Sequence, residues 1–115
     1  MKTARRRTFV VVGTTVDRRG AARRLAERVV ASRLAACAQF FAIRSVYRWK
    51  GKVESADEYL LLAKTRASLS SRLVRFIRRH HAYEVPEIVV TPILGGWRAY
   101  LEWIAAETRG NANRG

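Results

Sequence analysis

The stretch that decides the fold is residues 36–65, "ACAQFFAIRSVYRWKGKVESADEYLLLAKT". Its first part, residues 36–49, is rich in aromatic and β-branched residues, which is typical of a long strand. Lys50-Gly51-Lys52 has the composition of a turn. Residues 53–65 then predict the returning strand, so the whole stretch predicts a long β-hairpin.

A strand and a helix are expected before this hairpin. Residues 8–15, "TFVVVGTT", form a short apolar run that ends in glycine and threonine, which predicts a buried strand. Asp17 can cap a helix that follows. Apolar residues then recur at spacings of three and four, as on one face of a helix: Ala22, Leu25, Ala26, Val29, Val30 and Leu34.

After the hairpin, the same alternation of helix and strand is expected again. Ser68 begins a second helix, whose apolar face contains Leu69, Leu73, Phe76, Ile77 and His80. Residues 84–93, "EVPEIVVTPI", predict a fourth strand, which lies at an edge or is irregular where Pro86 lacks an N–H. A last helix follows Gly95-Gly96, with one stripe made of Trp97, Tyr100, Leu101, Ile104 and Thr108.

The order βαββαβ, followed by an extra C-terminal helix, predicts a ferredoxin-like α+β fold with both main helices on one face of an antiparallel sheet. A chain of 115 residues with 49% hydrophobic residues can bury one core. We therefore expect one domain over residues 9–108, a basic N-terminal tail over 1–8 and a disordered C-terminal tail over 109–115.

Several features bear on the compartment. The single cysteine, Cys37, cannot form a disulfide within the chain. No apolar run reaches the 18 or so residues that a membrane span needs, so no membrane partner is expected. The N-terminus is basic and then apolar, but glycine and threonine interrupt the apolar run and no signal cleavage site follows. We predict a cytoplasmic protein.

The charge is strongly positive, since 23 Lys and Arg residues against 9 Asp and Glu residues give a formal net charge of +14. Such a field attracts nucleic acid and other polyanions. Arginines opposite the apolar stripe of the first helix first predict a solvated face. A nucleic-acid or polyanion binding module is the less favoured alternative, and it would use Arg18, Arg19, Arg23, Arg24 and the tail residues Arg5–Arg7.

His80 and His81 are candidate metal ligands, because imidazole binds copper, zinc and nickel. Adjacent histidines on a helix point about 100° apart, which suits chelation poorly. The alternative is structural, with His80 packed under the second helix and His81 at its C-terminal end. Glu84 and Glu87, three apart in an extended segment, should point to opposite faces. They therefore do not predict acid/base catalysis, and Cys37 has no adjacent base, so no enzyme is predicted.

The assembled motifs resemble the CutA family of divalent-cation tolerance proteins. The match runs in order from about Phe9 to Thr108, and the tyrosine–tryptophan hairpin combined with Y-E-x-P-E-I is specific. It is carried by "TT" in the first strand, "RLAAC", "SVYRWKGKVE", "KT", "HAYEVPEI" and "TPILGGWRAYLEWI".

The resemblance implies a ferredoxin-like subunit in a tight homotrimer, without an established reaction and associated with copper and other divalent cations. Some bacterial members are credited with copper ligands at a histidine pair, which matches His80 and His81, and at a cysteine in the first strand. That cysteine position is Thr14 here. Because thiolate is the ligand that selects Cu(I), its loss disfavours that ion.

The resemblance also implies a cleft between subunits that is lined by shared polar residues. The net charge of +14 predicts that a ligand or partner of this protein is anionic. The residues that we expect to line the cleft are Arg33, Tyr47, Trp49, Lys64, Tyr83, Glu84 and Glu87.

Overall fold

A computed structural model describes residues 8–109, and its secondary structure follows the predicted order, βαββαβ and a final helix. The α+β, ferredoxin-like fold class is confirmed. Residues 1–7 and 110–115 lie outside the described residues, so the two tails stay predictions. The elements are β1 (Phe9–Val16), α2 (Arg19–Ala31), β2 (Cys37–Trp49), β3 (Lys52–Arg66), the 3₁₀ helix η1 (Ala67–Leu69), α3 (Ser70–Arg79), β4 (Ile88–Ile93) and α4 (Arg98–Glu107).

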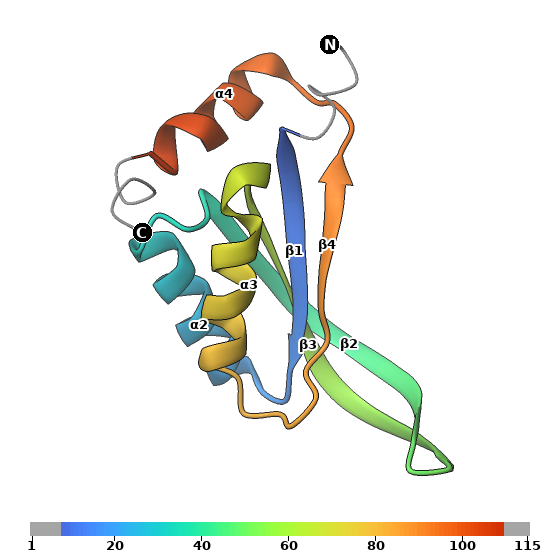
Figure 1. Cartoon of the computed structure of the whole chain (residues 1–115). Coiled ribbons are helices and arrows are strands. Elements are labelled where there is room, and N and C mark those ends of the chain that lie inside the picture. Colours follow the sequence, from blue (N-terminus) through green and yellow to red (C-terminus); the bar gives the residue numbers. More distant parts are fainter. Residues whose placement is uncertain (1–7, 110–115) are drawn as a thin grey trace.

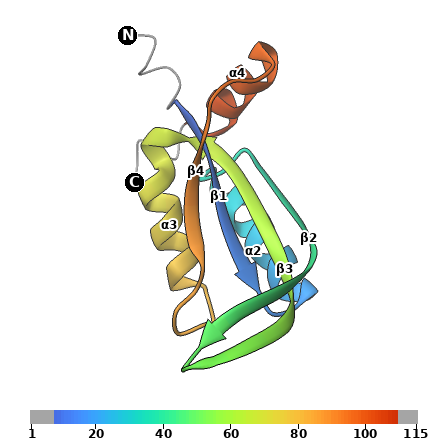
Figure 2. The ribbon, with the colours of Figure 1, turned by 90° about the vertical axis from the view of Figure 1, so that its right-hand side faces the viewer.

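The four strands form one antiparallel sheet in the order β2-β3-β1-β4 (Figure 1). β2 pairs with β3 along its whole length, from Cys37 opposite Lys64 to Trp49 opposite Lys52, where the hairpin closes. The turn requires positive φ at two residues, 50° at Lys50 and 82° at Gly51. The far end of this hairpin extends past the helices, at the opposite end of the molecule from α4 (Figures 1 and 2).

The core lies between the sheet and the helices α2 and α3. Strand residues alternate between the two faces, and every second residue of β1 from Val10 to Val16 points toward the helices. Core side chains without exposed surface come from the sheet and from both helices, and among them are Val12, Val29, Leu61, Leu73 and Ile77.

The other face of the sheet has a different surface. α2 and α3 both lie on one side of the sheet (Figure 1), so the alternate residues of each strand point away from them. Phe41 and Val89 are each 50% exposed on this second face. Val11, Leu60 and Leu62 add to its apolar character. We call this the helix-free face.

Several details of the predicted elements are wrong. The second main helix, α3, begins at Ser70 and not at Ser68, which lies in η1. Asp17 does not cap the first helix, because α2 begins one residue later, with Arg18 at the N-cap and no side-chain cap bond. Val30 is 40% exposed although its spacing fits the apolar stripe, whereas its neighbour Val29 is fully buried. The fourth strand begins at Ile88 and not at residue 84.

No helix within residues 8–109 is long and apolar enough to cross a membrane. The longest helix is α2, with 13 residues.

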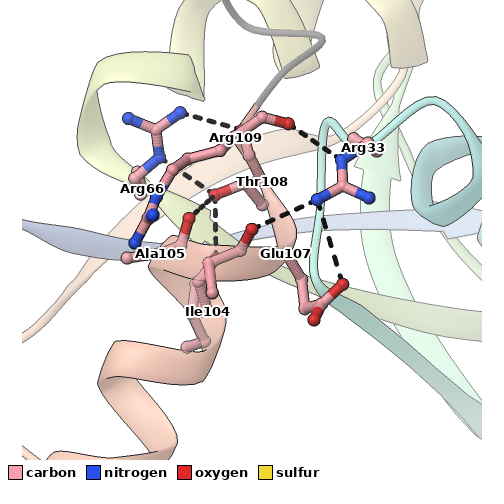
Figure 3. Close-up of polar contacts among 8 residues, drawn as sticks. Arg33, Arg66, Ile104, Ala105, Glu107, Thr108 and Arg109 are labelled. Carbon is pink, nitrogen blue, oxygen red and sulfur yellow. Dashed lines mark hydrogen bonds and ion pairs between the residues drawn. The ribbon is translucent and has the colours of Figure 1, made fainter.

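Two arginines fix the C-terminal end of α4 (Figure 3). Arg66 on β3 donates from Nε to Thr108 Oγ1 at 2.9 Å and from a terminal nitrogen to the Thr108 carbonyl at 2.8 Å. Arg33, in the loop after α2, donates to the Ala106 carbonyl at 3.1 Å and to the Arg109 carbonyl at 2.8 Å. Carbonyls at a helix C-terminus lack partners within the helix and attract cations, so these contacts attach α4 to the rest of the domain.

We expect Arg66→Met to loosen α4. The variant loses both bonds to Thr108, which should lower the free energy of unfolding by about 1–3 kcal/mol. Hydrogen exchange at the α4 amides should become faster, as measured by mass spectrometry. Arg98→Met is the matched control, because Arg98 forms only an exposed ion pair with Glu102. Unchanged α4 exchange in Arg66→Met would contradict this role.

Candidate functional site

A cleft of about 620 Å³ lies at the hairpin end of the sheet. Its walls are the last five residues of β2, Glu58 on β3, Thr15 near the end of β1 and the loop over residues 83–87. This size is in the range of small-molecule sites. The lining residues are Thr15, Ser45, Val46, Tyr47, Trp49, Glu58, Tyr83, Glu84, Val85 and Glu87.

His81 fixes the start of the loop that forms one wall. Its Nε2 lies 2.8 Å from the Thr15 carbonyl oxygen, and the Tyr83 backbone N–H donates to Nδ1 at 3.1 Å. A carbonyl can only accept and a backbone N–H can only donate, so the ring is neutral with its proton on Nε2. Both ring nitrogens of His81 are thereby used in holding the loop against β1.

Thr14 fixes the other end of the same loop. Its side chain is fully buried, and Oγ1 donates to the Glu87 carbonyl at 2.7 Å. Between these two attachments the chain bends and does not form a strand. The expectation that Glu84 and Glu87 point to opposite faces of an extended segment is therefore wrong, and both residues line the cleft.

Glu58 lies deep in the cleft and was missed by the sequence analysis. It is only 8% exposed, and Oε2 accepts a hydrogen bond from the Tyr83 hydroxyl at 2.8 Å. Burial is the main reason that the pKa of Tyr83 lies well above its usual range, and the bond to the Glu58 carboxylate raises it further. One feature of the sequence indicates that Glu58 is buried. In "DEYLLL", alternate residues of a strand share a face, so Glu58 lies on the same face as Leu60 and Leu62.

We expect Tyr83 to stay protonated in the folded protein well above the pH at which an unfolded tyrosine ionises, because its pKa is raised. The chain has 4 tyrosines, and an unfolded tyrosine loses its proton near pH 10. Above that pH the folded state binds more protons than the unfolded state, so stability falls as the pH rises. Absorbance at about 295 nm should show one tyrosine that ionises only on unfolding, and Tyr83→Phe should remove that late step. A normal alkaline titration of all tyrosines in the folded protein would contradict the buried bond.

His80 has a different environment from His81. It is exposed, its Nδ1 donates to the Phe76 carbonyl at 2.9 Å, and its ring stacks on Phe76 with 4.3 Å between centroids. The structural alternative thus assigned the two histidines the wrong way round: His81 is tied into the fold and His80 lies outside it. Among residues 8–109, no three His, Cys, Asp or Glu side chains are grouped so that they could hold a metal ion.

The seven residues expected in the cleft fall into two groups. Five of them line it together, namely Tyr47, Trp49, Tyr83, Glu84 and Glu87. Arg33 and Lys64 lie elsewhere in the chain. Arg33 binds the end of α4, and Lys64 Nζ donates to Gln39 Oε1 at 2.8 Å and lies 5.7 Å from the centroid of the Tyr100 ring.

The arginines considered for polyanion binding are only partly described. Arg18, Arg19, Arg23 and Arg24 are exposed on or just before α2, and Arg23 pairs with Glu27 at 3.2 Å. Arg5–Arg7 lie outside the described residues.

The sequence of this chain matches a known protein family over most of its length. The family model described as CutA1 divalent ion tolerance protein matches residues 10–107. The chain belongs to this family. The family predicted from the sequence motifs is confirmed.

Individual CutA proteins agree with this assignment. The chloroplastic CutA protein of Arabidopsis thaliana is 46% identical over 101 residues, which are 87% of this chain and 56% of that protein. The chain spans about half the length of the first curated relatives that it matches. The divalent-cation tolerance protein CutA of Thermus thermophilus is 41% identical over 99 residues, 85% of this chain and 96% of that protein.

Solved structures agree as well. CutA1 from Oryza sativa is 43% identical with a TM-score of 0.85, covering 89% of this chain and 94% of that one. The periplasmic divalent cation tolerance protein CutA from Archaeoglobus fulgidus is 31% identical with a TM-score of 0.86, covering 88% and 99%. None of these relatives is described as a nucleic-acid binding protein, so the alternative function gains no support.

Proposed function

We propose that this CutA protein is a non-enzymatic homotrimer of the cytoplasm that takes part in the response to divalent metal ions. Weak binding of copper or another divalent cation at His80 would be its contact with metal. Membership in the divalent ion tolerance family supports the role in metal response. The helix-free face of the sheet is the observation that carries the assembly.

The helix-free face gives a physical reason for assembly. Exposed apolar side chains on one contiguous face lose contact with water when copies of the chain meet there. β2 and β4 are also the edge strands of the sheet, and edge strands have unpaired backbone groups that a neighbouring chain can bind.

A cyclic trimer further requires two different surfaces of each chain to meet. The seven residues expected between subunits fit this requirement, because they lie in two places. Five line the cleft at the hairpin end, and Arg33 and Lys64 lie beside α4 at the other end.

We expect light scattering of the purified protein to give three times the mass of the chain. Val89→Lys should shift this mass toward one chain, because it places a charge on the helix-free face at the edge strand β4. Val30→Lys is the matched control, since Val30 has similar exposure on α2, on the other side of the sheet. A wild-type monomer, or the same shift in both variants, would contradict the proposed interface.

The metal contact follows from the unequal histidines. His81 has no free ring nitrogen, whereas His80 Nε2 has no partner among the described residues and is open to solvent. One imidazole from a chain makes a weak site that other ligands must complete. Thr14 supplies no thiolate, which favours a divalent ion over Cu(I).

We expect calorimetric titration with Cu(II) or Zn(II) to show weak, saturable binding that His80→Ala removes. His81→Asn should retain this binding, because His81 uses both nitrogens within the fold. If His81→Asn abolishes binding while the variant still folds, the loop must open to release His81, and His80 alone is not the site. Binding that survives in His80→Ala would place the metal elsewhere.

A further inference from the structure

The outer side of the two main helices is strongly basic. α2 and α3 contact each other and lie on the same side of the sheet (Figure 1). Each helix contains four arginines, and the two helices share a single acidic residue, Glu27 in α2. The sequence analysis considered the arginines of the first helix and of the tail, and the structure places those of α3 beside them.

Four of these arginines point directly away from the core. Arg24 and Arg28 each follow a buried alanine of α2 by two positions. Arg75 and Arg79 each follow a fully buried residue of α3 by two positions. Two positions correspond to about 200° around an α-helix, so all four side chains lie opposite the core, and all four are exposed. We call the surface that these four residues form the arginine surface.

The arginine surface has no anionic partner within the described residues. Glu27, the one acid of the two helices, pairs with Arg23 at 3.2 Å. The other ion pairs within residues 8–109 involve none of the four arginines. On each helix the two arginines are four positions apart, where equal charges repel and destabilise the helix. An anion bound between them would relieve this repulsion.

The proposed assembly leaves this surface open. Copies of the chain that meet through the helix-free face bury one side of the sheet, and α2 and α3 lie on the other side (Figure 1). The arginine surface is exposed in the single chain as well. Binding there therefore does not depend on the trimer, on His80 or on the cleft.

The side chains of the two helices favour phosphate groups over nucleic-acid bases. Every basic residue of α2 and α3 is an arginine, whose planar guanidinium can bind two phosphate oxygens at once. Neither helix contains tryptophan, tyrosine, asparagine or glutamine, which stack on bases or bind their edges. Phe76 is half-buried and already stacks on His80. A ligand made of phosphate groups alone thus fits this surface better than a nucleic acid does.

The same composition disfavours a membrane or a protein as the partner. Helices that bind a membrane surface insert apolar side chains, and protein interfaces have an apolar centre. Val30 is the one large apolar residue of α2 and α3 that is exposed. The arginine surface therefore has charge to offer and almost no apolar area.

A chain of phosphates fits better than free phosphate. One exposed arginine and one phosphate contribute little in water, whereas a chain that reaches both helices makes each further contact within the same complex. We propose that the arginine surface binds linear inorganic polyphosphate, in which phosphates are joined through shared oxygens. Its phosphates would contact Arg24 and Arg28 on α2 and Arg75 and Arg79 on α3.

The test is a calorimetric titration of the full chain with long-chain sodium polyphosphate at about 50 mM salt. We expect saturable binding that weakens about 50- to 150-fold at about 200 mM salt, as four phosphate contacts predict. Arg24→Gln/Arg28→Gln and Arg75→Gln/Arg79→Gln should each weaken binding about tenfold, because each removes two contacts. Glutamine is a good helix former, so both variants should keep the circular dichroism of the wild type.

Matched controls separate the arginine surface from the charge of the whole chain. Arg48→Gln/Lys52→Gln removes two exposed cations from the hairpin and lowers the net charge by the same amount. This variant should bind polyphosphate almost as the wild type does. Orthophosphate at equal phosphate concentration should give no saturable binding. Single-stranded RNA at equal phosphate concentration, and vesicles that contain anionic phospholipid, should each bind at least about tenfold more weakly.

Several outcomes would overturn the proposal. Absence of saturable polyphosphate binding at low salt removes it outright. Equal weakening by the helix variants and the hairpin variant would mean attraction by overall charge alone. RNA that binds as tightly as polyphosphate would mean a nucleic-acid surface, and vesicles that do so would mean a membrane surface. None of these results bears on the mass of the assembly or on Cu(II) binding at His80, so the proposed function is judged separately.

Discussion

The structure depends on a limit of coverage: two helices can shield only one face of a four-stranded sheet. α2 and α3 pack on the face that carries Val12 and Leu61, and this core holds the domain together. The opposite face keeps its apolar residues, Phe41 and Val89 among them, without a helix above it. The far end of the hairpin is also left uncovered, since none of the described helices reaches it (Figures 1 and 2). Burial of this apolar face against other copies of the chain would remove it from water, which favours assembly.

The fold could be predicted because its signals are local and repeated. Alternating residues in the hairpin and helical spacing around Leu73 and Ile77 depend only on neighbours in the sequence. The predictions of individual elements were wrong where contacts between distant parts of the chain, or the end of a helix, override a local pattern. Residues 84–87 have the composition of a strand start, but Thr14, 73 residues away from Glu87 in the chain, binds the loop. His80 has the spacing of a core residue, yet α3 ends at Arg79 and leaves it outside.

The candidate site could be predicted only in part for the same reason. Tyr47, Trp49 and Tyr83 were expected in a cleft between subunits through their family motifs. They line one cleft together within the chain, and its place between subunits stays a prediction. Glu58 belongs to no such motif, and its importance comes from burial and from the Tyr83 hydroxyl, which only the folded chain shows. Net charge averages over the whole chain and does not give the charge of one cleft. Among the described residues, Glu58, Glu84 and Glu87 line the cleft and no Lys or Arg does.

Thr14 bears both on metal binding and on the shape of the cleft. The family resemblance implies a cysteine ligand at this position in some bacterial members, but here a hydroxyl donates to the Glu87 carbonyl at 2.7 Å. A hydroxyl is a stronger hydrogen-bond donor than a thiol, so it holds the loop more firmly, and it is a poor ligand for a soft metal ion. The next attachment along the loop, His81, is likewise used twice for backbone bonds. Two positions that could bind a metal, Thr14 and His81, are therefore used in this chain to hold the loop that forms one wall of the cleft.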